Sequence, residues 1–220
     1  MKPCRAFMAG LLVFLVFIFP VSFGWGLDGH FTICKIAQSR LSRAAADAVQ
    51  RLLPEYANGE LANVCIWADR IKFRYRWSSA LHYPLHVGFA EDKGGNTIEV
   101  HWYTRKQNLH HIWDSNIIET AEEKFYDSSL DGLIDAIQTN ITKEWTDEVE
   151  EWEKCNSKKI ACTDIYASES IRAACDWAYK GVTEGATLAA QYFSTRVPVV
   201  YLRLAQGGVR LAAVLNSIFG

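Results

Sequence analysis

The sequence has no excess of basic side chains, and this limits how the protein can bind a polyanion. Its 220 residues include 23 lysines and arginines against 25 acidic residues, which gives a formal net charge of −2. An acidic chain lacks the Lys/Arg surplus that ordinarily neutralises the phosphates of nucleic acids. If the protein acts on nucleic acid, groups other than lysine and arginine must supply much of the positive charge.

The sequence also has no internal repeat, no low-complexity tract and no linker rich in Gly, Ser or Pro. These absences exclude a repeat array and a multidomain scaffold. At about 150 residues per domain, the length fits one domain. Hydrophobic residues make up 50% of the chain and charged residues 22%, a composition far from that of a disordered protein. The chain is therefore expected to fold around a single core.

Residues 1–24 have the pattern of a secretory signal peptide. A short positive segment ends at Arg5, an unbroken apolar run covers residues 7–19, and small residues stand at positions −3 and −1 of a cut before Trp25. The apolar run is shorter than the ~20 residues that span a bilayer, which disfavours a membrane anchor. No second hydrophobic stretch of spanning length is expected. We therefore predict a soluble product, residues 25–220, that is secreted or vacuolar.

Five cysteines remain after the predicted cleavage: Cys34, Cys65, Cys155, Cys162 and Cys175. In an oxidising compartment cysteines are expected to pair, so an odd number predicts that one thiol is left over or lacks its partner. A disulfide between the first two would join two predicted helices, and the pairing of the other three stays open. A glycosylation acceptor at Asn140-Ile141-Thr142 agrees with secretion.

Helical spacing of apolar residues dominates the mature chain. Apolar residues recur three to four positions apart over residues 30–53, a run that Pro54 stops, and residues 61–73 indicate a second helix. The same spacing covers residues 108–125, 130–152, 164–180 and 196–219, with breaks expected inside the longer spans.

One segment has the alternation of a small β-hairpin. Gly94-Gly95-Asn96 form a turn signal between alternating apolar residues at 87–89 and at 98–102. The predicted fold is therefore a mostly α, single domain with one small hairpin.

His110 and Asp114 are the most informative pair of chemically active residues. They are four positions apart on a predicted helix, so both side chains emerge on one face, where a single metal ion could contact both. Imidazole and carboxylate groups suit zinc. Further candidates are His30, Asp69, His82 and His86.

Each of these residues also has an ordinary explanation. A His/Asp pair at helical spacing is often a surface pair or a cap, Asp69 precedes Arg70 and could form a salt bridge, and His82 and His86 could be loop residues. Their joint occurrence behind a signal peptide is what points to a metal site.

Several motifs, taken together, resemble the S1/P1 nucleases, and most of all the plant bifunctional endonucleases. The resemblance covers the mature chain in order, and it is carried by Trp25-Gly26, Gly29-His30, Trp67-Ala68-Asp69, Ser79-Ala80-Leu81-His82-Tyr83, Pro84-Leu85-His86, Lys93-Gly94-Gly95-Asn96 and Asn108-Leu109-His110-His111-Ile112-Trp113-Asp114. It implies a mostly helical, secreted, monomeric glycoprotein with three zinc ions. Such enzymes cut single-stranded DNA and RNA to 5′-nucleotides and remove 3′-phosphates from nucleotides.

The resemblance also implies a role for each candidate residue. The implied ligands are the amino group and carbonyl of Trp25 with His30 for one zinc, Asp69 with His82 for a second, and His86, His110 and Asp114 for a third. Asp69, His86 and Asp114 are further expected to act in catalysis, and Asn96 to contact the substrate near the scissile phosphate. The zinc ions would supply the positive charge that the polypeptide lacks.

The sequence departs from the family pattern between Tyr83 and Pro84. Family members carry a long segment there, with a His-x-x-x-Asp-x-His-Gln motif whose His and Asp are zinc ligands and with cysteines of its own. Without it, only the site of His86, His110 and Asp114 keeps a full set of protein ligands. The gap also removes a core helix, and we predict strongly reduced or absent nuclease activity for this chain.

Two other functions are compatible with the same residues. A zinc-dependent phospholipase C shares an N-terminal Trp and a similar metal cluster, but the match over residues 101–114 and the late helices favours a nuclease. A non-enzymatic alternative is a secreted zinc-binding or nucleic-acid-binding protein without turnover.

Overall fold

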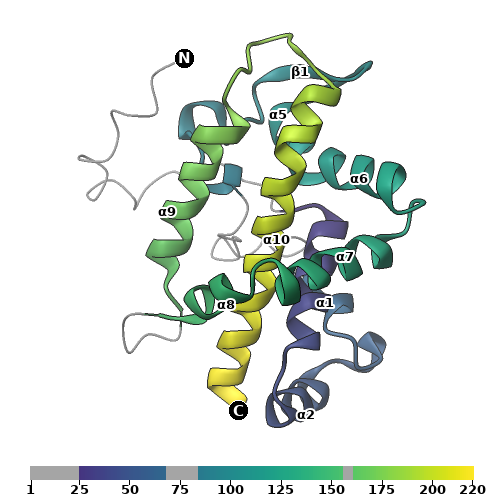
Figure 1. Ribbon diagram of the computed structural model, residues 1–220, viewed down its shortest axis with the longest axis vertical. Coiled ribbons are helices and arrows are strands. Elements are labelled where there is room, and N and C mark those ends of the chain that lie inside the picture. The colour runs from purple at the N-terminus through teal and green to yellow at the C-terminus, as the bar shows by residue number, and fades with distance from the viewer. Residues whose placement is uncertain (1–24, 68–83, 156–160) are drawn as a thin grey trace.

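Helix α10 (Ala190–Phe219) runs through the middle of the molecule, and the other helices pack around it (Figure 1). The structure is a computed structural model, which describes residues 25–67, 84–155 and 161–220. Helix α1 (Leu27–Ser39) lies alongside α10 and makes the most extensive contact of any described pair of elements. The two backbones approach closely at Gly208, where an added Cβ would lie 2.6 Å from the Cβ of Ile36.

The rest of the described chain is mainly helical, as predicted from the spacing of apolar residues. The further α-helices are α2 (Arg43–Leu52), α3 (Ala62–Cys65), α5 (Leu109–His111), α6 (Ile117–Phe125), α7 (Leu130–Lys143), α8 (Thr146–Glu153) and α9 (Thr163–Ala173). Shorter turns are the 3-10 helices η2 (Glu55–Ala57), η3 (Pro84–Val87) and η4 (Ala90–Asp92) and the π-helical turns η5 (Ile112–Asn116) and η6 (Ala174–Ala178).

The single helix predicted over residues 30–53 is wrong, because α1 and α2 are separate helices. Ser42 caps α2, since its hydroxyl accepts a hydrogen bond from the backbone N–H of Ala45 at 3.1 Å. Asn216 of α10 accepts from the N–H of Ser42 at 2.8 Å and donates to the carbonyl of Arg40 at 3.1 Å. The break is thus stabilised by a cap and by a contact from the far end of the chain.

The small sheet is present, but its turn is not where the sequence pattern indicated. Strand β1 (Glu99–Trp102) pairs antiparallel with β2 (Arg105–Asn108) and parallel with β3 (Thr187–Leu188), in the order β2-β1-β3. The hairpin turns at Tyr103, which has a positive φ of 54°. The sequence did not predict β3.

Residues 87–89 do not form the predicted strand, because the following backbone is hydrogen-bonded locally. The N–H of Gly94 donates to the carbonyl of Phe89 at 2.9 Å, and the N–H of Thr97 donates to that of Asp92 at 3.1 Å. These bonds close a compact loop and leave no ladder for a hairpin around residues 94–96.

Two disulfides link neighbouring helices in the described ranges. Cys34–Cys65 joins α1 to α3, which confirms the predicted bridge, and Cys155–Cys162 joins the end of α8 to the start of α9. Cys175 is disulfide-bonded as well. No cysteine is free among the described residues of the uncleaved chain. The expectation of a left-over thiol concerns the chain after signal cleavage and stays a prediction.

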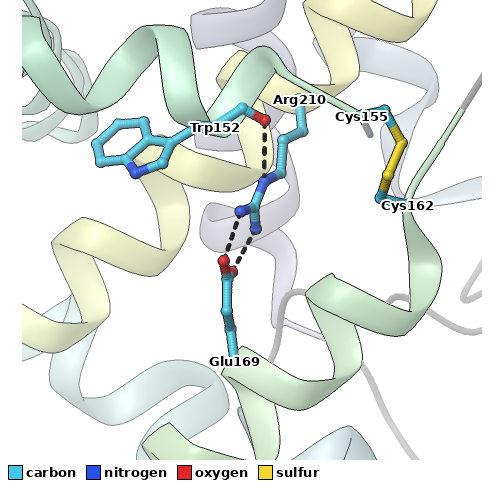
Figure 2. Close-up of a disulfide and its surroundings, with 5 residues drawn as sticks. All are labelled: Trp152, Cys155, Cys162, Glu169 and Arg210. Carbon is cyan, nitrogen blue, oxygen red and sulfur yellow. Dashed lines mark hydrogen bonds and ion pairs between the residues drawn. A yellow bond between two sulfur atoms is a disulfide. The ribbon is translucent and has the colours of Figure 1, made fainter. Parts of the chain in front are cut away.

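Beside the second disulfide, α10 is fastened to α8 and α9 by a buried ion pair (Figure 2). Arg210 contacts both carboxylate oxygens of Glu169 at 2.6 and 2.8 Å, and its Nε donates to the carbonyl of Trp152 at 3.4 Å. Arg203 reaches the same carboxylate at 2.9 Å. Both arginine residues are only 3% exposed. Although burial raises the pKa of Glu169, the hydrogen bonds from Arg210 and Arg203 hold it below its ordinary value.

Helix α10 corrects the expectation that no second apolar stretch of spanning length is present. Among the described residues, this one helix is long and apolar enough to cross a membrane by length and composition alone. Within the fold, 61% of the qualifying window is buried, and the helix carries the ion-paired Arg203 and Arg210. This placement is that of a core helix.

Candidate functional site

His110 and Asp114 lie on one continuous helical segment formed by α5, η5 and α6. The side chain of Asn108 caps its start and accepts from the N–H of His111 at 2.8 Å. Asp114 falls within the π-helical turn η5, a type of local distortion that often occurs at functional sites. His110 is 1% and Asp114 9% exposed, so both side chains face the interior.

The ring of His110 is oriented by a carbonyl group. Its Nδ1 lies 2.8 Å from the carbonyl oxygen of Gly94. Because a carbonyl only accepts hydrogen bonds, Nδ1 carries a proton, and in the neutral imidazole the acceptor lone pair is then on Nε2. Histidines that bind metals are typically oriented in this way, with the non-ligating nitrogen donating to a carbonyl or carboxylate.

His86 lies beside His110, although the two residues come from different parts of the chain. Their rings are stacked with centroids 6.1 Å apart and an interplanar angle of 25°. His86 is in η3, which precedes the loop that contains Gly94. Gly94 has a φ of 66° and packs so closely on the carbonyl of Leu85 that a Cβ would clash. The absence of a side chain at position 94 therefore lets the loop lie against the segment that carries His86.

The start of α1 packs against the helix that carries Asp114. The N–H of Gly26 donates to the carbonyl of Asp114 at 3.1 Å. Trp25 is fully buried and His30 is 8% exposed. A Cβ on Gly29 would lie 2.8 Å from the Cβ of Trp25, so the first turn of α1 folds tightly over this indole. The fold thus brings the backbone at residues 25–26 directly against Asp114.

The positions of the other predicted site residues say less about their roles. Asn96 is half-buried in the loop that carries Gly94, and its Nδ2 donates to the carbonyl of Lys93 at 2.8 Å. Asn140 is half-buried on α7. Asp69 and His82 lie outside the described residues. Their predicted roles stay predictions.

The imidazole and carboxylate groups of this region are of the kind that binds zinc, but their arrangement fits a zinc site only in part. His110 has the orientation expected of a ligand, with His86 beside it and Asp114 one turn away. However, no group of three or more His, Cys, Asp or Glu side chains within residues 25–67, 84–155 and 161–220 is arranged to hold a metal ion. The complete site predicted for His86, His110 and Asp114 is therefore not confirmed.

Two residues that support this region, Asp92 and Tyr179, were not predicted from the sequence. The hydroxyl of Tyr179 donates to Oδ1 of Asp92 at 3.0 Å. The same carboxylate oxygen accepts from the N–H of Gly95 at 2.8 Å. Neither residue belongs to a motif that we singled out, and 87 positions separate them, so no local pattern could have found the contact.

The sequence profile of the S1/P1 Nuclease family matches residues 25–83 and 80–220. The chain belongs to the S1/P1 nuclease family. Endonuclease 2 of Arabidopsis thaliana is 50% identical to it over 287 aligned positions, which cover 100% of this chain and 99% of that protein. Endonuclease 4 of the same plant is 40% identical, covering 89% of each chain. Nuclease S1 of Aspergillus oryzae is 24% identical, covering 90% of this chain and 93% of the fungal one.

The mostly helical fold with a small three-stranded sheet agrees with the fold expected from the resemblance. Membership and fold together place the chain among the nucleases, a class of hydrolases that act on nucleic acids.

Proposed function

We propose that the chain is a secreted, monomeric, zinc-dependent endonuclease of the S1/P1 type. The substrates of enzymes of this type are single-stranded DNA and RNA, which are hydrolysed to 5′-nucleotides, and 3′-nucleotides, from which the phosphate is removed. The observation that carries the proposal is the buried His110, which lies one turn before Asp114 and whose Nδ1 is hydrogen-bonded to the carbonyl of Gly94. The chain is also 50% identical to an endonuclease. Exposed aromatic side chains could stack unpaired bases without reading their identity.

His86, His110 and Asp114 would hold one zinc ion with a full set of protein ligands. The two further sites of the family, which correspond to Trp25 with His30 and to Asp69 with His82, would each lack ligands in this chain. When bound, zinc supplies a Lewis acid for phosphoryl oxygens and lowers the pKa of the water that it holds. The chain's own residues orient the ligands: Gly94 keeps the proton of His110 on Nδ1, and Gly26 fixes the backbone of Asp114. Asn96, in the adjoining loop, would contact the substrate.

We further propose that this chain lacks a segment between Tyr83 and Pro84 and has strongly reduced activity. Two findings support this. The family profile matches in two parts that meet at residues 80–83, and the alignment with Endonuclease 2 extends over 287 positions although the chain has 220 residues. A loss of ligands would leave the zinc cluster incomplete.

The zinc content of the signal-cleaved protein tests the ligand assignment. We expect one zinc ion per molecule by elemental analysis, and three would contradict the missing segment. His110→Ala should release this ion, because it removes the oriented imidazole. His111→Ala is the matched control, since it changes the neighbouring histidine of the same helix and should retain the ion. If His110→Ala keeps the metal, the ligands are wrongly assigned.

Hydrolysis of denatured DNA tests the activity. We expect little or no turnover by the purified chain, and vigorous hydrolysis that a chelator abolishes would contradict the proposed impairment. A second candidate function is a catalytically inactive secreted protein that binds zinc or nucleic acid, which the alignment over 287 positions against a chain of 220 residues favours. Binding of a single-stranded oligonucleotide without turnover would support it.

A further inference from the structure

The hydroxyl of Tyr179 is the centre of a hydrogen-bonded network behind the candidate site. Tyr179 directly follows η6 and is 7% exposed, with its ring packed on Phe89 at a centroid distance of 5.0 Å. The hydroxyl donates to Oδ1 of Asp92 at 3.0 Å and accepts from the N–H of Phe89 at 3.4 Å. Burial raises the pKa of Tyr179, and the nearby charge of Asp92 adds to this effect. The hydroxyl therefore keeps its proton and remains a donor around neutral pH.

Asp92 connects Tyr179 to the backbone of the loop that contains Gly94 and Gly95. Its Oδ1 also accepts from the N–H of Gly95 at 2.8 Å, and its backbone carbonyl accepts from Thr97 at 3.1 Å. Phe89 closes the other side of the loop by accepting from the N–H of Gly94 at 2.9 Å. The hydroxyl of Tyr179 is thus bonded to the start of the loop directly, at Phe89, and to Gly95 through the carboxylate of Asp92.

The loop in turn contacts His110 at two backbone carbonyls. The carbonyl of Gly94 accepts from Nδ1 of the imidazole at 2.8 Å, and that of Gly95 accepts from the backbone N–H of His110 at 3.3 Å. The loop also packs against Leu85, next to His86, and carries Asn96. A change in the position of Gly94 and Gly95 would therefore change the orientation of the His110 ring.

We propose that Tyr179 and Asp92 are positioning residues that hold the Gly94–Gly95 backbone so that His110 keeps its proton on Nδ1 and presents Nε2 for coordination. Tyr179 acts on His110 through Asp92 and the loop. The part of this inference that concerns metal coordination by His110 rests on the proposed function. The orientation and tautomer of the imidazole are properties of the chain alone.

The first test is nitrogen NMR of the metal-free, 15N-histidine-labelled chain. We expect His110 to show the Nδ1–H tautomer in the wild type and a mixture of tautomers in Tyr179→Phe, because the loop loses its donor while the ring of the side chain stays. Tyr201→Phe is the matched control. It removes another half-buried hydroxyl, which bonds to the hydroxyl of Tyr126 at 3.3 Å and contacts no part of the loop, so the His110 signal should not change.

The second test uses two variants of Asp92. Asp92→Asn keeps an oxygen that can accept from both Tyr179 and Gly95, so it should behave as the wild type. Asp92→Ala removes the acceptor and should disturb the His110 signal as Tyr179→Phe does. If Tyr179→Phe does not fold, as judged by its melting curve, the comparison of the two Asp92 variants decides.

Zinc titration is the third readout. Tyr179→Phe and Asp92→Ala should each weaken binding by about 10-fold or more, the usual effect of removing a residue that orients a metal ligand, and the double variant should be no weaker than either single one. Unchanged His110 signals in folded Tyr179→Phe and Asp92→Ala would overturn the inference. If the wild type binds no zinc, the proposed function fails, while the NMR comparison still decides the positioning role.

Discussion

The backbone N–H of Gly26 donates a hydrogen bond to the carbonyl oxygen of Asp114, with a nitrogen–oxygen distance of 3.1 Å. This bond ties the residue next to Trp25 to the turn that contains a predicted zinc ligand. The approach is so close that a Cβ on Gly26 would lie 2.8 Å from Oδ1 of Asp114 and 2.5 Å from Oγ of Ser115. Since the φ of Gly26 is −61°, the need for glycine is steric and not conformational.

Gly26→Ala should therefore displace Asp114 or the start of α1. We expect the free energy of unfolding to fall by about 1–3 kcal/mol, the usual cost of forcing an extra methyl group into a packed site. Zinc binding should fall as well if Asp114 is a ligand. Chemical denaturation and zinc titration measure the two effects. Gly132→Ala on α7 is the control, because there an added Cβ comes no closer than 3.3 Å to its neighbours. Equal stability of Gly26→Ala and the wild type would contradict the steric argument.

Glu169→Gln should destabilise the contact between α9 and α10. The guanidinium groups of Arg203 and Arg210 both contact the carboxylate of Glu169. The substitution removes the negative charge and leaves the two guanidinium groups buried. Breaking a buried pair in this way costs about 3 kcal/mol. The control is Glu153→Gln, which breaks the more exposed pair with Arg40 and should cost less than about 1 kcal/mol. Urea denaturation compares the two variants.

The contribution of Glu169 also has a defined pH dependence. Because its pKa in the folded protein is lowered, the stabilisation is present above the ordinary value of 4.5 and is lost as the pH falls below it. The difference in stability between the wild type and Glu169→Gln should therefore shrink in acid. If the difference in stability stays constant as the pH falls below 4.5, the ion pair of Glu169 is not the source of the stabilisation.

Local periodicity explains which parts of the fold the sequence could predict. The spacing of apolar residues placed the helices, and the spacing of four between His110 and Asp114 placed both residues on one helical segment, because these patterns depend only on neighbours along the chain. The Cys34–Cys65 bridge followed from the two helices that it joins.

Contacts between distant residues explain the predictions that failed. The break between α1 and α2 depends partly on Asn216, 174 positions after Ser42, and the loop around Gly94 depends on Tyr179. Such contacts leave no periodic signal. The local signal that was available, Ser42 as a helix cap, was outweighed by the continuous apolar spacing over residues 30–53. The hairpin turn was misplaced because Gly94 and Gly95 serve a different loop, whereas the observed turn uses Tyr103 with a positive φ.

Gly208→Ala should destabilise the core more than any surface change. An added methyl group would overlap the side chain of Ile36, with its Cβ 2.6 Å from that of Ile36 and 3.1 Å from the carbonyl of Ile33. We expect a loss of about 3 kcal/mol, because α1 and α10 would have to separate. Adding Ile36→Ala should restore part of this loss by making room for the methyl group. If the double variant is as unstable as the sum of the two single ones, the close approach is not the cause.

We predict that the stability contributed by Glu122 depends on pH in the opposite direction from that contributed by Glu169. Its Oε1 is buried and accepts no hydrogen bond from any described residue. Burial raises its pKa to about 7, and the neighbouring charges of Asp28, Glu119 and Glu123 add to the shift. The hydroxyl of Tyr201, on α10, also lies close enough for Glu122 to raise its pKa. The folded state therefore binds the Glu122 proton more tightly than the unfolded state, whose carboxyl has its ordinary value of 4.5.

The stability that this group contributes is fully present below pH 4.5 and is lost as the pH rises through about 7. Glu122→Gln mimics the protonated side chain, so the variant should match the wild type at about pH 4 and be more stable at about pH 8. Melting temperatures measured across this range test the difference. Glu148→Gln, an exposed change on α8, controls for the loss of one negative charge and should shift the melting temperature little at either pH. If Glu122→Gln and the wild type differ equally at both ends of the range, the carboxyl does not titrate in the folded protein between them, and its burial has no such consequence for stability.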